Sequence, residues 1–319
     1  MTRRVANVRV TQSQMISLLL KRFFHGLIVL WVVATLTFLL LRLAPGGPFD
    51  SDRKLPPEVI ANLEAKYHLD EPVWQQYLRY LSGIAQGDLG PSYKYLDRGV
   101  TQIIADTLST SVLLGGLAVL FALLVSFPTG LLAAYYRNSI IDRFCMFLAT
   151  LGISLPNFIL GALLIWAIAL KLGWLYAARW DQWSSAILPV ITLGAAPAAY
   201  LSALLRSTLI ETFGEDFIRT ARAKGLKELT VVAKHALSHS LIPVLTVMGP
   251  IVATLLTGSF VVEFVFAIPG MGRFFISAVT DRDYPLIMGV TMVYTAILVS
   301  ANFLVDVLYG YVDPRIRTH

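Results

Sequence analysis

The chain has 319 residues, of which 56% are hydrophobic and only 14% are charged, and its mean hydropathy is +0.67. Soluble domains carry about 25% charged residues, so the composition excludes an ordinary soluble protein and predicts an all-α polytopic membrane protein. The net charge of +6 comes with no nucleic-acid-binding motif, and the single cysteine, Cys145, excludes an intrachain disulfide.

Six stretches contain no Asp, Glu, Lys or Arg and are 19 to 30 residues long. A helix needs about 20 mostly apolar residues to cross a hydrocarbon core, so each stretch predicts one transmembrane helix. A buried helix of a soluble core would explain one such stretch but not six. The stretches are 23–41, 107–136, 144–170, 182–205, 235–262 and 284–305.

The first stretch follows Lys21 and Arg22, as the apolar part of a secretory signal would. It is longer than the apolar core of a secretory signal, which usually has about 7 to 15 residues. The following "RLAPGGPF" contains no Ala-x-Ala cleavage site. We therefore expect a retained first transmembrane helix over 23–43, preceded by an N-terminal arm over 1–22.

The largest segment outside the membrane is expected over 44–108. Its opening "APGGP" ends the first helix, and "LPPEVIANLEAKYHL" then begins a helical pattern with proline in the first turn. In "EPVWQQYLRYLSGIAQGDLG", Val73, Tyr77, Leu81 and Ile84 recur at helical spacing. Three interpretations stay open: helices on the membrane surface, helices at the outer mouth of a pore, or a small packed cap without a ligand role.

Basic residues predict the topology, because Lys and Arg in short loops stay on the cytoplasmic side. Of the 26 basic residues, 15 lie in the N-terminal arm, the second-to-third and fourth-to-fifth connections, and the tail. Seven of the other 11 lie in or beside the long acidic segment between the first two helices, which is expected to be translocated regardless of charge. Both termini, 1–22 and 310–319, are therefore predicted to be cytoplasmic, and 44–108 periplasmic.

The cytoplasmic connection 206–235 contains "FIRTARAKGLKELTVVAKHAL". As a helix, it places Phe217, Ala221 and Lys224 on one face, and small Ala221 and Ala223 allow a partner surface to approach closely. Gly225 suits the end of that helix. We expect a short amphipathic helix that transmits a push from a partner; the alternative is a basic helix resting on anionic lipid.

Two short outer connections carry special residues. "KLGWLYAARWDQW" is rich in Trp and Tyr, which is typical of a bilayer interface, with a role in substrate contact as the alternative. "AIPGMGRFFISAVTDRDYPL" is interrupted by Gly and Pro and predicts a re-entrant or gating loop. The candidate outer gate consists of Pro269, Gly270 and Gly272.

Catalysis by this chain is not expected. It has no phosphate-binding Gly-x-x-x-x-Gly-Lys-Ser/Thr loop, no His-Glu-x-x-His metal pair and no Gly-x-Ser-x-Gly nucleophile elbow. His235 and His239 are four residues apart but suit an interfacial position better than a metal site. We expect no metal and no catalytic residue.

Two non-enzymatic alternatives were compared. An ion-coupled secondary transporter needs ionisable groups near the bilayer midplane, whereas the charged residues Arg42, Arg206, Glu263 and Asp306 all lie at span ends. A membrane docking or signalling protein would use the helix of 206–235 simply as a binding site. The first alternative lacks its coupling group, and the second stays open.

Several segments resemble one family. "FIRTARAKGL" is similar to the cytoplasmic coupling motif of permease subunits of bacterial ATP-binding-cassette importers, matching at Arg219-Thr220-Ala221 and Gly225 but lacking the motif's glutamate and its later proline. "RLAPGGPF", "GDLGPSYKY", "IPGMGRFF", "DRDYPL" and "VDVLYGYVDPRIR" resemble the B-type permease of oligopeptide and dipeptide importers. The resemblance runs from about residue 20 to the C-terminus, and "GPSYKY" favours the oligopeptide subgroup.

The resemblance implies a type I importer permease fold with six transmembrane helices, whose core is expected over 109–309, in a bacterial inner membrane. It further implies a homologous C-type permease partner, two cytoplasmic ATPase subunits that bind ATP and magnesium, and a periplasmic peptide-binding protein. The chain itself would hold no cofactor and would carry oligopeptides as half of a channel. The implied ATPase-docking residues are Phe217, Arg219, Thr220, Ala221, Arg222, Ala223, Lys224, Gly225 and Leu226.

Overall fold

The computed structural model describes residues 12–49, 56–95, 97–178, 180–257 and 260–312. Within these ranges the regular structure is helical, apart from one isolated β-bridge between Pro91 and Gly99, as the composition predicts. The first half of the N-terminal arm, with Arg3, Arg4 and Arg9, and most of the tail lie outside the described residues. The elements are α1 (Gln12–Leu43), α2 (Pro57–Lys66), α3 (Val73–Gln86), α4 (Val100–Tyr135), α5 (Ile140–Ser154), α6 (Asn157–Leu164), the π-helix η1 (Ile165–Lys171), α7 (Trp183–Phe213), α8 (Asp216–Ala223), α9 (Glu228–Thr230), the π-helix η2 (Val231–Ala236), α10 (Leu237–Thr257), α11 (Phe260–Val265), α12 (Met271–Asp281) and α13 (Tyr284–Val312).

Five helical segments among the described residues are long and apolar enough to cross a membrane. They correspond to five of the six predicted spans and extend beyond some of them, because a charged residue interrupts an apolar count without interrupting a helix. α4 begins at Val100, before Asp106, and α7 continues past Arg206 to Phe213. The segments are Leu20–Leu43, Val100–Tyr135, Trp183–Phe213, Glu228–Val265 and Tyr284–Leu304.

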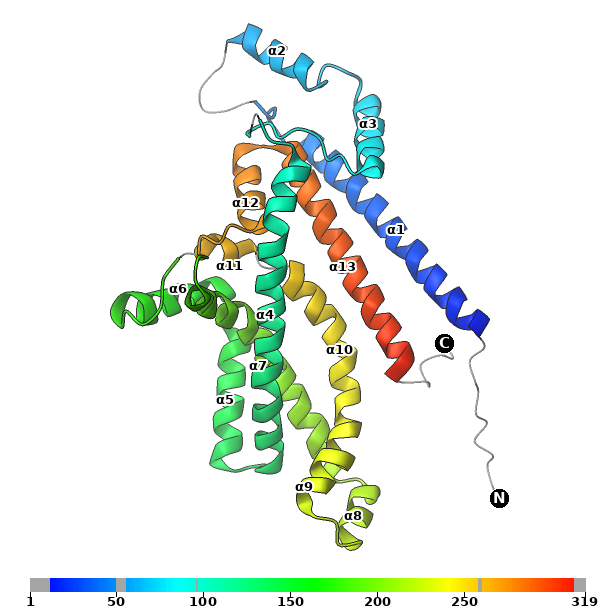
Figure 1. Ribbon diagram of the computed structural model, residues 1–319, viewed down its shortest axis with the longest axis vertical. Helices are drawn as coiled ribbons and strands as arrows, with labels where there is room; N and C mark the ends of the chain where they lie inside the picture. The colour runs from blue at the N-terminus through cyan, green and yellow to red at the C-terminus, as the bar shows by residue number, and fades with distance from the viewer. Residues whose placement is uncertain (1–11, 50–55, 96, 179, 258–259, 313–319) are drawn as a thin grey trace.

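The third predicted span, 144–170, is not one straight helix. α5 and the α6–η1 segment meet at an angle of 109°, and Figure 1 shows α6 turned away from α5. The bend lies at Leu155-Pro156, where Leu155 is extended with ψ of 119°. A proline disfavours the helical conformation of the residue before it, so the charge-free run continues while the helix stops. The six expected crossings are thus five helices and one bent pair.

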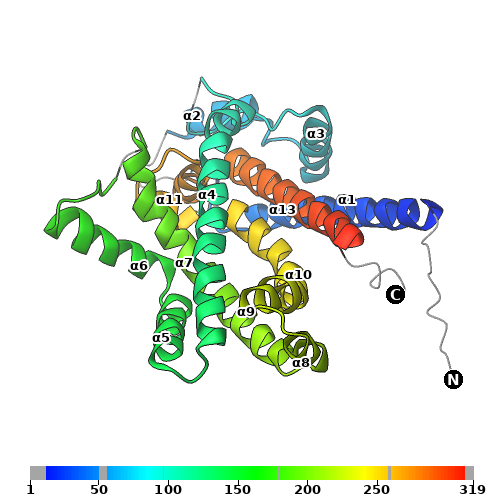
Figure 2. The ribbon, with the colours of Figure 1, turned by 60° about the horizontal axis from the view of Figure 1, so that its bottom comes forward.

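α4 and α7 lie side by side along most of their length and form the centre of the bundle (Figures 1 and 2). A Cβ atom added to Gly130 of α4 would lie 2.8 Å from the Ser202 carbonyl oxygen of α7, closer than ordinary contacts permit. The Thr129 hydroxyl also donates to the Ser202 hydroxyl at 2.8 Å. Small residues and hydroxyl hydrogen bonds therefore hold this pair, as is usual for helices packed within a membrane.

Different helices form the two ends of the molecule. α8 and α9 lie at one end, and α2, α3 and α12 lie at the opposite end (Figure 1). The start of α1 and the end of α13 both lie away from α2, α3 and α12 (Figures 1 and 2). The connection 206–235 and the outer segment 44–108 are therefore on opposite sides of the bundle, as their predicted topology requires.

The predicted helical patterns of the outer segment are confirmed as α2 and α3. Prolines mark both starts, with Pro56 and Pro72 as the capping residues, and α3 ends at Gly87 with a left-handed φ of 76°. The hydroxyls of Tyr77 and Thr35 lie 2.6 Å apart, which ties α3 to α1.

Candidate functional site

The segment predicted to transmit a push forms the helix α8, Asp216–Ala223. Lys224 caps it, and Gly225 follows with a left-handed φ of 76°. The Gly225 N–H donates to the Arg222 carbonyl at 2.9 Å, and the Leu226 N–H donates to the Ala221 carbonyl at 3.4 Å. This pair of bonds is the Schellman motif, which glycine favours because it has no Cβ to clash. The predicted helix end at Gly225 is therefore confirmed.

One face of α8 is buried within this chain. Ile218 is 0% exposed and Ala221 is 5% exposed, and both pack into an apolar cluster built by α7, η2 and α10. Phe217 and Lys224, which the sequence places on the same face as Ala221, are exposed instead. The small side chain of Ala221 thus lets α8 pack closely on its own bundle. The face of α8 opposite Ala221 is the one left for a partner. Other buried members of this cluster are Leu205, Leu209, Val231, Ala236 and Val244.

The exposed face combines positive charge with apolar side chains. Leu229, in the neighbouring helix α9, is 81% exposed, although it was not among the residues predicted from the sequence. The available signal was a second leucine, three residues after Leu226, in the charged stretch "KGLKEL". The other exposed members are Phe217, Arg219, Thr220, Arg222, Ala223, Lys224, Gly225 and Leu226.

An ion pair stiffens this tip. Arg222 donates from Nη2 to Glu228 Oε1 at 2.7 Å and from Nε to Oε2 at 3.2 Å, and its guanidinium lies 5.9 Å from the centre of the Phe213 ring. The pair closes the turn around Gly225, so α8 and α9 form one unit. Arg219 reaches only its neighbour Asp216, at 3.4 Å, in a highly exposed pair.

α8 is connected to the long helix α10 in two ways. The chain passes through α9 and the π-helix η2, a form found often at functional sites, directly into α10. In addition, the Phe217 ring lies 4.7 Å from the His239 ring of α10. His235 lies within η2, and no group of His, Cys, Asp and Glu able to hold a metal ion occurs in the described part of the chain.

At the opposite end, segments far apart in sequence converge. Arg282, with a left-handed φ of 56°, donates from Nη1 to the carbonyls of Pro45 at 3.1 Å and Gly47 at 3.3 Å. The Tyr284 hydroxyl donates to the Gly46 carbonyl at 3.3 Å. "APGGP" and "DRDYPL" therefore fold against each other.

Asp283 brings a third segment to this place. Its carboxylate is 0% exposed and accepts hydrogen bonds from the Ser92 hydroxyl and from the backbone N–H groups of Tyr93 at 3.1 Å and Lys94 at 3.3 Å. It also accepts from the Leu286 N–H at 3.3 Å, which caps α13. The "GPSYKY" loop is thus fastened to the start of the last helix.

The candidate outer gate is a tightly held turn. Pro269 is exposed, whereas Gly270 and Gly272 are buried. The Gly272 N–H donates to Glu263 Oε2 at 2.7 Å, which places a carboxylate at the start of α12, where negative charge is favoured. The Met271 N–H donates to the Ser111 hydroxyl at 2.9 Å. Glu263, which the sequence analysis noted only as a residue at a span end, is the centre of this turn.

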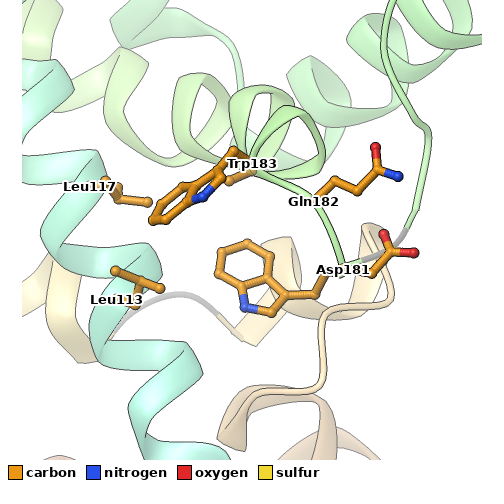
Figure 3. A pocket seen from close by; sticks show the side chains of 7 residues that line it. Leu113, Leu117, Asp181, Gln182 and Trp183 are labelled. Atoms are coloured by element: carbon orange, nitrogen blue, oxygen red, sulfur yellow. The ribbon is translucent and has the colours of Figure 1, made fainter.

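The Trp-rich connection borders a small cavity of about 170 Å³. Figure 3 shows the Trp183 side chain near Leu113 and Leu117 of α4, while Asp181 and Gln182 point away from the two leucines. Small-molecule sites usually measure about 300 to 1,000 Å³, so this cavity is small for a substrate. Its aromatic lining suits the interfacial interpretation of the segment.

Comparison with known sequences identifies the family. Residues 126–318 match the family described as the binding-protein-dependent transport system inner membrane component, and residues 15–114 match the N-terminal region of such components. This chain belongs to that family. The permease is 44% identical to the dipeptide transport system permease protein DppB of Bacillus subtilis, covering 94% of this chain and 98% of that protein.

Other relatives come from oligopeptide systems. The permease is 42% identical to the oligopeptide transport system permease protein OppB of Haemophilus influenzae and 39% identical to OppB of Escherichia coli, in both cases over 95% of this chain and 100% of the relative. The resemblance to peptide importer permeases is therefore confirmed. Dipeptide and oligopeptide permeases show similar identity, so the preference indicated by "GPSYKY" stays a prediction.

Solved structures confirm the fold. An inward-facing form of the MetNI methionine ABC transporter matches with a TM-score of 0.56 at 18% identity, over 66% of this chain and 96% of that chain. An amino acid ABC transporter crystallised with histidines matches with a TM-score of 0.54 at 17% identity, over 66% and 94%. The chain is thus a multi-pass inner-membrane permease with the fold of ABC importer permeases, and it is not itself the ATPase.

Proposed function

We propose that this permease forms half of a channel that carries oligopeptides from the periplasm to the cytoplasm, with both of its own termini cytoplasmic. A homologous C-type permease supplies the other half, and a periplasmic binding protein delivers the peptide. Two cytoplasmic ATPase subunits bind ATP and magnesium, so this chain needs no cofactor. The names and full-length coverage of the peptide permease relatives support this assignment.

The exposed tip formed by α8 and α9 is the observation that carries the proposal. The Gly225 turn and the Arg222–Glu228 pair hold it together, and it lies at the end of the bundle opposite the outer segment. Its buried face is anchored by Ile218 and Ala221, so a force on the exposed face moves the helix as a unit with α10. Nucleotide binding in the partners would push α8, and hydrolysis would let it return.

A peptide substrate needs a path lined by protein or water. Each unpaired backbone polar group costs several kcal/mol in hydrocarbon, so a single helix bundle facing lipid cannot carry a peptide. Two permeases facing each other provide a shared polar path. The tight turn of Pro269, Gly270 and Gly272 at the outer end is our candidate for the gate of this path.

Reconstitution tests the function. We expect peptide uptake into vesicles only when this permease, the C-type permease, both ATPases and the binding protein are present with ATP and magnesium. A non-hydrolysable nucleotide should stop uptake. Uptake driven by a proton gradient without nucleotide would instead establish the secondary transporter, and absence of uptake with intact partner binding would establish the docking protein.

A further inference from the structure

A cavity of about 380 Å³ lies between the end of α1, the outer helices α2 and α3, and the start of α13, far from the α8 tip. Its size falls within the usual range for small-molecule sites of about 300 to 1,000 Å³. The polar residues that matter for its chemistry are Arg42, Lys66, His68, Gln76, Arg79 and Tyr80.

Two cations in this cavity lack an anion. Arg42 is half-buried and lies over the Phe38 ring at 5.3 Å, and Lys66 lies over the Tyr67 ring at 5.5 Å. Within the described residues, neither makes an ion pair. A partly buried guanidinium without a counter-charge is costly, so the cavity is electrostatically incomplete.

The other charged groups of the lining are already engaged. Arg79 donates to Glu71 at 2.6 Å, and His68 lies 3.1 Å from the same carboxylate. The acid in the lining, Asp88, accepts the Gly90 N–H at 2.9 Å within its own turn. Since Glu71 neutralises Arg79, the cations Arg42 and Lys66 outnumber the anion Asp88, and the lining keeps a net positive charge.

Among the residues that the structure describes, two buried polar atoms of the lining also have no hydrogen-bond partner. Gln76 is only 8% exposed; its Nε2 donates to the carbonyls of Leu69 at 3.1 Å and Glu71 at 2.7 Å, but its Oε1 accepts nothing. The Tyr80 hydroxyl is buried and unpaired, and burial raises the pKa of this phenol, which keeps it protonated. Both atoms are buried in the wall of the cavity, beside the two cations, and buried polar groups in native proteins normally have partners.

The cavity lies at a membrane boundary. Arg42 belongs to the last turn of the apolar helix α1, and the Tyr77–Thr35 contact holds α3 against the same helix one to two turns earlier. Trp74 and Leu78 on α3 are exposed, and an exposed Trp beside an apolar helix is typical of the interface between hydrocarbon and headgroups. Phospholipid phosphates are the abundant anions at that depth.

We propose that this cavity binds the phosphodiester headgroup of a membrane phospholipid. Arg42 and Lys66 contact the phosphate oxygens. The lipid then joins α1 to the outer helices. This site is separate from peptide transport and does not depend on the proposed function.

Native mass spectrometry of the delipidated, purified full chain, titrated with phosphatidylglycerol or phosphatidylethanolamine, tests the site. We expect Arg42→Gln with Lys66→Gln to weaken lipid binding at least about tenfold, because charge-assisted hydrogen bonds to an oxyanion are lost. Lys171→Gln is the matched control, since Lys171 also lies over an aromatic ring, 6.0 Å from Trp166, but outside the cavity. This control should bind lipid as the natural chain does.

Lys66→Gln alone is a second variant, because Lys66 is exposed and its replacement spares the packing of α1. It should weaken binding in the same direction. Unchanged lipid affinity in both cavity variants would overturn the proposal, as would an equal loss in the Lys171→Gln control. Inorganic phosphate should not displace the lipid; displacement at similar concentrations would assign the cavity to a free anion and overturn the lipid assignment.

Discussion

Arg206 on α7 donates two parallel hydrogen bonds to Asp142 on α5, from Nε to Oδ1 at 2.6 Å and from Nη2 to Oδ2 at 2.7 Å. The Asp142 side chain is 4% exposed and also accepts the Asn138 N–H at 2.8 Å. This bidentate pair joins the first helix of the bent span to the central helix, at the end of the bundle nearest α8.

Removing one partner of this pair should destabilise the permease. We expect Asp142→Asn or Arg206→Met to cost about 3 kcal/mol, because each leaves a buried charge or polar group unpaired. Unfolding of the purified chain in mixed detergent micelles measures the change. Arg219→Gln, which breaks the exposed pair with Asp216, is the control and should leave stability unchanged; an equal effect of both changes would contradict the role of burial.

Gly225 can be tested through its backbone conformation. No atom lies within 4 Å of where a Cβ would stand, so the obstacle to a side chain is the left-handed φ of 76°, which costs other residues about 1 to 2 kcal/mol. Gly225→Val should abolish transport-coupled ATPase stimulation while membrane insertion stays intact. Gly225→Asn should retain most of the stimulation, since Asn tolerates this conformation. Normal stimulation by the valine variant would refute the docking role of α8.

Leu229 should contribute apolar contact to the ATPase. We expect Leu229→Asp to reduce co-purification of the ATPase subunits at least about tenfold, because a charge replaces an apolar side chain at an interface core. Ile140→Asp is the control, since Ile140 is 83% exposed at the start of α5 and lies outside the tip. Loss of association in the control alone, or in both variants equally, would argue against a specific surface at α8 and α9.

Asp283 should hold the outer loop in place. In Asp283→Ala, hydrogen exchange at the Tyr93 and Lys94 amides should accelerate at least about tenfold, because both lose a buried charged acceptor and open locally. Asp281→Ala removes a neighbouring carboxylate that pairs with the Lys94 ammonium at 3.2 Å in an exposed position. That control should leave exchange nearly unchanged, and equal acceleration in the two variants would show that Asp283 is not the anchor.

The candidate gate offers two adjacent positions for comparison. A Cβ on Gly270 would collide with Glu263 Oε2 and lie 2.6 Å from Ser111 Oγ, so Gly270→Ala must displace the carboxylate that holds α12. We expect slower peptide uptake by the reconstituted complex and lower thermal stability of the turn. Pro269→Ala, at an exposed position, should affect both much less. Full uptake by Gly270→Ala would show that this turn is not the gate.

The sequence alone determined the class of the protein, the apolar segments that cross the membrane and the end of α8. These are local properties: hydropathy follows from composition, and a glycine that must adopt a left-handed φ can be recognised next to its helix. The sequence could not show that the span 144–170 bends, because α4, α7 and α10 also contain prolines and continue through them, so a proline alone does not decide where a helix stops.

Only the tertiary structure decided which side chains meet. Asp283 and Ser92 are 191 residues apart, and Asp142 and Arg206 are 64 apart, so no local pattern pairs them. The same holds for α8, where helical periodicity groups Phe217 with Ala221, yet docking against α7, η2 and α10 buries Ala221 with Ile218 and leaves Phe217 on the surface. Periodicity defines the faces of a helix, but the neighbours that cover a face are brought there by the rest of the chain.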